Sequence, residues 1–149
     1  WLVMSADIVT ARQEGVKLIV VLIDNGGYGS IGSLSTSLGS AGFGTQLRFR
    51  ETDGTLAQRR VEIDFAANAR SLGVNVVTAD RLADLRRALA DAKASNESTV
   101  IVTHTDMSIK VGGYESWWEV PPAEVSTLDS VKAARAGYDE AAKKKRWHL

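Results

Sequence analysis

Several features that assign proteins to classes are missing from this chain of 149 residues. It has no cysteine, which excludes disulfides and thiolate metal sites and is compatible with a reducing, cytoplasmic location. It has no charge excess, because 18 Lys and Arg balance 18 Asp and Glu. It also has no apolar run of the ~18 residues that a membrane span needs. We therefore expect a globular domain that binds neither nucleic acid nor membranes.

Apolar residues instead alternate between helical and extended patterns. We expect helices over residues 6–14, 65–72 and 81–93, and strands over 16–23, 74–78 and 99–103. This alternation favours a parallel sheet with right-handed crossovers, in an α/β fold of three layers: helix, parallel sheet, helix. The expected N-caps are Ser5, Asp64 and Asp80, and the expected buried face of the third helix consists of Leu82, Leu85, Leu89 and Ala92.

The remaining segments carry weaker patterns. Residues 26–44 hold seven of the thirteen glycines, which predicts a loop. Residues 47–60 are polar, with a turn expected at Asp53-Gly54. Residues 107–125 are expected to be irregular, and a last helix is expected from Thr127 or Asp129 to about Arg146, where its basic end faces solvent.

The turn Asp24 to Ser30 is the strongest candidate for a binding site. It follows the apolar run 16–23, and the carboxyl ends of such strands are where open α/β sheets bind ligands. An asparagine oxygen and a nearby backbone carbonyl are ligands that Mg²⁺ accepts, and exposed amides can meet phosphate oxygens. A glycine-rich connection without any ligand explains the composition equally well.

The residues of this turn resemble a known motif. Asp24-Asn25-Gly26-Gly27-Tyr28-Gly29-Ser30-Ile31 is similar to the second half of the thiamine-diphosphate motif, which begins Gly-Asp-Gly and closes on Asn-Asn. Residues 1–11 resemble the helix that follows Gly-Asp-Gly in that family. The resemblance implies a pyrophosphate-binding domain that is truncated at its N-terminus, with Gly-Asp-Gly just upstream of Trp1. Asp24 departs from the family, which has asparagine there.

The resemblance also implies roles for individual residues. Asn25 would bind Mg²⁺ through its side chain and Gly27 through its carbonyl, while Tyr28, Gly29 and Ser30 would line the diphosphate of thiamine diphosphate. The activating glutamate of the family lies on a pyrimidine-binding domain, usually of a partner subunit. We therefore expect a homo-oligomer, no catalytic residue in this chain, and no activity of the chain alone.

A second resemblance narrows the family. Residues 112–126, the segment 64–73 and the turn 26–32 are similar to trihydroxycyclohexanedione hydrolases of myo-inositol breakdown. This implies a pyrophosphate-binding domain over residues 1–105 and an extension over 106–149. Trp117 and Trp118 in that extension are expected to pack the tail onto the domain rather than contact substrate.

Four polar residues remain as weak candidates. Asp106 and Glu115 could reach a polyol substrate. His104 ends a strand and so could face the site, but we expect a capping or solvent role for it, and a terminal position without function for His148.

Three hypotheses for function follow. The first is a thiamine-diphosphate-dependent hydrolase that cleaves a C–C bond of a cyclic 1,2-dione, a small polyol substrate. The second, within the same cofactor class, is an acetolactate-synthase-like or glyoxylate-carboligase-like enzyme. The third is a non-catalytic α/β domain that mediates subunit contacts through its Gly/Ser-rich loop and apolar tail.

Overall fold

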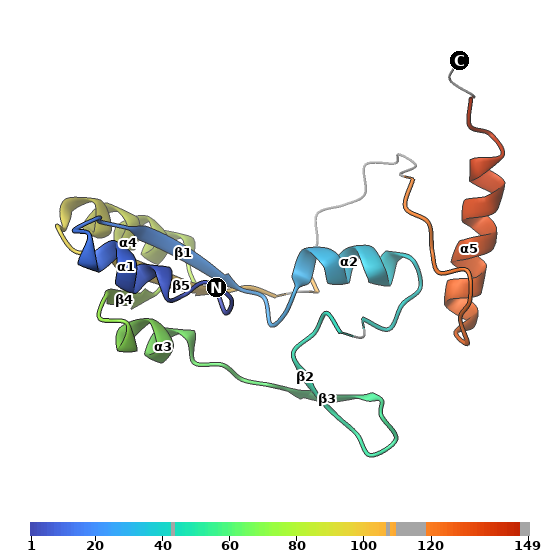
Figure 1. Ribbon diagram of the computed structural model, residues 1–149, viewed down its shortest axis with the longest axis horizontal. Helices are drawn as coiled ribbons and strands as arrows, with labels where there is room; N and C mark the ends of the chain where they lie inside the picture. Colours follow the sequence, from blue (N-terminus) through green and yellow to red (C-terminus); the bar gives the residue numbers. More distant parts are fainter. Residues whose placement is uncertain (43, 107, 110–118, 147–149) are drawn as a thin grey trace. The chain divides into compact units, whose positions relative to one another are not determined.

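The computed structural model describes residues 1–42, 44–106, 108–109 and 119–146. Contacts divide the chain into two compact units, residues 1–25 with 62–106 and residues 26–61 with 107–149. Figure 1 labels the helices and strands of both units. The sequence resemblance predicted a domain over residues 1–105 and an extension over 106–149. The contacts do not test that boundary, which stays a prediction.

The first unit is built on a three-stranded parallel sheet. Its strands are β1 (Ile19–Asp24), β4 (Asn75–Thr78) and β5 (Thr99–His104), in the order β1-β5-β4. Both pairings are parallel, with Ile19 and Asn75 each opposite Thr99. The three expected strands are confirmed, although β1 begins three residues after the start of the apolar run at Val16.

The central strand β5 supplies the core on both faces of this sheet. Val100 and Val102 lie in one buried cluster with Leu22 of β1, while Ile101 between them lies in a second cluster. All three β5 residues are at most 2% exposed. Their alternation to opposite faces follows from the two-residue repeat of a strand.

Helices cover both faces of the sheet, which confirms the three expected layers. Ile8 of α1 (Asp7–Gln13) and Ala69 of α3 (Phe65–Ser71) belong to the cluster that contains Val100. Ala88 of α4 (Leu82–Ala94) packs in the cluster around Ile101. Leu82 was expected in the buried face of this helix, but it is the first helical residue and is 64% exposed.

Only one of the three predicted side-chain caps is present. The Asp64 Oδ1 accepts a hydrogen bond from the Ala67 amide at 2.7 Å, as expected of an N-cap aspartate. The predictions for Ser5 and Asp80 were wrong, because the N-caps of α1 and α4 are Ala6 and Arg81 and neither makes a side-chain cap bond. Asp80 is bonded across the sheet instead, to the end of β5.

Two cations from the N-terminal segment bind the carbonyl ends of helices. Arg12 Nη1 donates to the Leu72 carbonyl at the end of α3, at 2.9 Å. Lys17 Nζ donates to the carbonyls of Lys93, at 3.0 Å, and of Ser95, at the end of α4. Positive charge is favourable at a helix C-terminus, so these contacts secure the amino-end edge of the sheet.

The second unit contains elements that sequence patterns did not predict. The expected loop 26–44 includes helix α2 (Gly29–Ser37), although its two glycines and four serines are poor helix formers. The polar stretch 47–60 forms a hairpin of β2 (Arg48–Arg50) and β3 (Leu56–Arg60) around the expected turn. The Arg59 guanidinium of β3 lies 3.6 Å from the centre of the Phe49 ring of β2. The two strands are therefore joined by a cation–π contact between their side chains.

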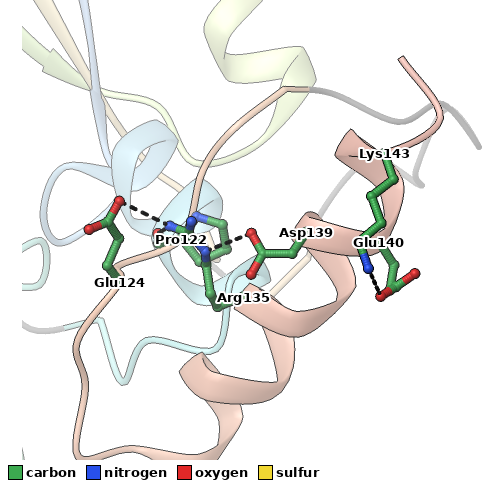
Figure 2. Close-up of polar contacts among 6 residues, drawn as sticks. All are labelled: Pro122, Glu124, Arg135, Asp139, Glu140 and Lys143. Carbon is green, nitrogen blue, oxygen red and sulfur yellow. Dashed lines mark hydrogen bonds and ion pairs between the residues drawn. The ribbon is translucent and has the colours of Figure 1, made fainter.

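The C-terminal helix α5 (Asp129–Ala142) carries an arginine that links it to the segment before it. Figure 2 shows Arg135 between Asp139 and Glu124, and its Nε donates to the Asp139 Oδ1 at 2.9 Å. Its Nη1 lies 3.6 Å from the Glu124 Oε1 and 3.4 Å from the Pro122 carbonyl.

The predictions for Trp117 and Trp118 lie outside the described residues. In the part of the chain that the structure describes, no helix is both long and apolar enough to cross a membrane.

Replacing the confirmed cap tests the local account of α3. Asp64→Ala removes the acceptor for the Ala67 amide and should lower the free energy of unfolding by about 1 kcal/mol. Asp64→Asn keeps an oxygen acceptor and should stay within a few tenths of a kcal/mol of the parent. Urea denaturation compares the three proteins, and equal losses for Ala and Asn would contradict the capping role.

Candidate functional site

Polar residues gather at the carboxyl-end edge of the three-stranded sheet. The last residues of β1 and β5, Asp24 and His104, are opposite each other in the register. The Thr105 amide donates to the Asp24 carbonyl at 2.9 Å and extends this pairing beyond the strands. Asn25 follows Asp24 directly, so the candidate ligand lies at the edge where parallel α/β sheets bind ligands.

An aspartate–histidine pair lies at the same edge and was missed by sequence reasoning. The Asp80 Oδ1 accepts the His104 backbone amide and lies against the His104 Nδ1, both at 2.9 Å. These two hydrogen bonds, the backbone one first, hold the pKa of Asp80 below its ordinary value, so its carboxylate is charged at neutral pH. Asp80 was expected to cap a helix, and only the parallel register of β4 and β5 shows its other role.

The glycine-rich turn after β1 is held by backbone bonds within the second unit. Gly26 has a φ of 72° and its carbonyl accepts the Leu47 amide at 3.0 Å, while Gly27 forms a bridge with Gln46. The Tyr28 amide donates to the Thr45 carbonyl at 2.8 Å. The Tyr28 amide therefore already has a protein acceptor, while its side chain is exposed.

Thr45 explains why glycine is needed at two positions of this region. A Cβ on Gly27 would lie nearer than 3.0 Å to the Thr45 carbonyl oxygen, which is backbone and cannot move aside cheaply. A Cβ on Gly32 would lie 2.9 Å from the Thr45 Oγ1. Thr45 itself is buried, and its hydroxyl donates to the Gly42 carbonyl at 2.8 Å. No sequence pattern marks this threonine.

Helix α2 begins directly after the turn, at Gly29, with Tyr28 as its N-cap. The amides of Gly29 and Ser30 belong to the first helical turn, where the preceding chain offers no intrahelical acceptor. These amides and the helix dipole favour a negatively charged group at this end. The two residues expected to line a diphosphate therefore occupy the positive end of a helix.

The donor set of this turn fits a magnesium ion bound to a diphosphate. Among the described residues no group of three or more His, Cys, Asp or Glu side chains could hold a metal. The Asn25 side chain and the Gly27 carbonyl are oxygen ligands of the kind Mg²⁺ accepts. One residue separates them, so the chain keeps their Cα atoms within about 7 Å.

Of the other candidates, only Asp106 and His104 lie in the described part of the chain. Asp106 is the last residue of the first unit, two residues beyond β5. Glu115 and His148 lie outside the described residues, and nothing tests their proposed roles.

Comparison with known proteins identifies the family. The family described as "Thiamine pyrophosphate enzyme, C-terminal TPP binding domain" matches residues 1–103. The chain belongs to this family. The match covers the sheet up to Thr103 of β5 and the whole turn from Asp24 to Ser30. The α/β fold and the thiamine-diphosphate class implied by the sequence resemblance are therefore confirmed.

Individual relatives agree with the narrower resemblance. The chain is 40% identical over 136 residues to 3D-(3,5/4)-trihydroxycyclohexane-1,2-dione hydrolase 1 of Bacillus cereus, and 40% identical over 132 residues to hydrolase 2 of the same organism. The hydrolase of Bacillus thuringiensis is also 40% identical over 136 residues. Each alignment covers 88% of this chain but 20% of the relative, so the chain spans about a fifth of these proteins.

The close approach of Gly27 to Thr45 gives a direct test of the turn. Gly27→Ala should lower the free energy of unfolding by about 1–3 kcal/mol, because the new methyl group overlaps a backbone carbonyl. Gly137→Ala is the matched control, since Gly137 lies within α5 and a Cβ added there would have nothing within 4 Å. That control should raise stability by about 0.5–1 kcal/mol. Thermal unfolding measures both, and an unchanged Gly27→Ala variant would contradict the packing described.

Proposed function

We propose that this chain is the cofactor-diphosphate-binding part of a thiamine-diphosphate-dependent hydrolase that opens trihydroxycyclohexane-1,2-dione by cleaving a C–C bond. The observation that carries the proposal is the Asn25-Gly26-Gly27 turn at the end of β1, inside the matched thiamine pyrophosphate domain. The identity of 40% to the dione hydrolases supports the substrate class.

The proposed roles of the residues follow from the donors that they offer. The Asn25 side-chain oxygen and the Gly27 carbonyl bind Mg²⁺, which links the protein to the diphosphate. The Gly29 and Ser30 amides at the start of α2 bind diphosphate oxygens, and Tyr28 lines the same group through its side chain. When bound, thiamine diphosphate supplies the electron sink for C–C cleavage, and this chain holds and orients it.

Other parts of the protein complete the site in this proposal. The third protein ligand of the metal and the carboxylate that activates the cofactor come from outside this chain, the latter from a pyrimidine-binding domain. Two exposed apolar features support a contact of this kind. Tyr28 at the N-cap of α2, together with Ile31 and Leu34 within this helix, exposes apolar surface, and Val21 and Ile23 are exposed on β1. We therefore propose a homo-oligomer and no activity of the chain alone.

The other hypotheses have less support. Nothing in the described residues favours an acetolactate-synthase-like or glyoxylate-carboligase-like activity over the dione hydrolase. The exposed apolar residues Tyr28, Ile31 and Leu34 also fit a purely structural interface domain. Assaying the complete protein that contains this chain with trihydroxycyclohexane-1,2-dione and with pyruvate separates the three. Turnover of the dione alone is expected, turnover of pyruvate alone favours the second hypothesis, and turnover of neither favours the third.

Cofactor binding tests the metal role of Asn25. In the complete protein, Asn25→Ala should weaken thiamine diphosphate binding in the presence of Mg²⁺ by about tenfold or more, since even outer-shell partners of a metal contribute that much. Asn96→Ala is the matched control, because Asn96 is an exposed asparagine that precedes β5 at the opposite edge of the sheet. The Asn96→Ala protein should bind thiamine diphosphate as tightly as the parent protein. Isothermal titration calorimetry measures both, and equal affinities for Asn25→Ala and Asn96→Ala would contradict the proposal.

A further inference from the structure

His104 is held by two hydrogen bonds to one oxygen atom. The Asp80 Oδ1 accepts from the His104 backbone amide and contacts the His104 Nδ1, each at 2.9 Å. The connection after β4 is also tied to β5 by the Ala79 amide, which donates to the Val102 carbonyl, and by the Thr103 hydroxyl, which donates to the Ala79 carbonyl. The imidazole contact is therefore additional to what the fold needs, and it sets the orientation of the ring.

The pairing also determines which ring nitrogen carries the proton. A carboxylate only accepts hydrogen bonds, so the Nδ1 that faces Asp80 must be the protonated nitrogen. In the neutral imidazole the Nε2 then has a free lone pair and acts as an acceptor. Asp80 thus converts His104 into a side chain that presents an acceptor on its outer side.

The strand register places His104 at the same edge of the sheet as the end of β1. His104 is opposite Asp24 in the register, and Asp24 immediately precedes Asn25. Its side chain is 56% exposed, so a ligand can reach the ring. The charged residues beside His104 at this edge are Asp80, Asp24 and Asp106, with Arg81 directly after Asp80. An unprotonated ring nitrogen accepts hydrogen bonds, so its fitting partner is a hydroxyl donor and not an anion.

We propose that the Nε2 of His104 accepts a hydrogen bond from a hydroxyl group of the polyol substrate, with Asp80 as its positioning residue. This inference rests on the proposed function, because it places a polyhydroxylated ring at the carboxyl-end edge. It assigns His104 a part in substrate selection: analogues that lack the bonded hydroxyl leave a polar acceptor without its partner and bind less well.

Two substitutions of His104 separate the functions of its two nitrogens. In His104→Asn, the side-chain amide nitrogen takes the position of Nδ1 and can still donate to Asp80. This variant has no atom at the position of Nε2. His104→Gln places an amide oxygen near the Nε2 position and gives up the Nδ1 bond. For the complete protein acting on trihydroxycyclohexane-1,2-dione, His104→Asn should raise KM about two- to tenfold with unchanged thermal stability.

His104→Gln should have a KM closer to that of the parent, because its oxygen restores an acceptor. A parent-like KM for His104→Asn would overturn the inference. Thiamine diphosphate affinity, measured in parallel by calorimetry, should be unchanged in both variants. If the parent protein neither binds the cofactor nor turns over the dione, the proposed function fails, and this outcome is distinct from a failure of His104 alone.

The tautomer gives a readout that does not depend on activity. In the complete protein, ¹⁵N-histidine labelling reports on the ring nitrogens, and the signals that disappear in His104→Asn belong to His104. At a pH where the ring is neutral, we expect a protonated Nδ1 and an unprotonated Nε2. Asp80→Ala should abolish this preference, and Asp80→Asn should retain it, because the amide oxygen can still accept both bonds. A protonated Nε2 in the parent would overturn the inference.

Discussion

The pairing of β5 on both of its sides is the constraint on which the candidate site depends. Val100, Ile101 and Val102 are buried on alternating faces, so a shift of β5 by one residue would move each side chain from its own packed cluster into the other. Because β1 and β4 both run parallel to it, their carboxyl ends meet at one edge. The register therefore places the end of β1 beside His104, and His104 beside Asp80.

The turn after β1 depends on a second constraint, the contact of glycines with Thr45. The Thr45 carbonyl accepts the Tyr28 amide and leaves no room for a Cβ on Gly27. This arrangement brings the chain directly into α2, whose first amides are available to a negatively charged group. Local packing in the second unit thus fixes the turn to which the proposed function assigns phosphate binding.

Sequence patterns predicted the elements that are stabilised by apolar faces or by a local cap, and they missed the others. The three strands of the parallel sheet and the helices α1, α3, α4 and α5 carry apolar patterns or a cap such as Asp64, and they were predicted. Helix α2 and the β2–β3 hairpin were missed because their serines, glycines and arginines carry no apolar pattern. Gly32 of α2 lies against Thr45, and the hairpin has Arg59 over the Phe49 ring. Asp80 was misread as a cap because its partner His104 is 24 residues away and is reached only across a strand pair.

Hydrogen exchange of the complete protein tests the central claim, that the end of β1 and the start of α2 bind the cofactor. Adding thiamine diphosphate with Mg²⁺ should slow amide exchange in peptides that cover Asn25 to Ser30. Peptides covering Gly73 and Asn96, which precede β4 and β5 at the opposite edge, should be unchanged. Protection at that opposite edge, with none at residues 25–30, would contradict the account.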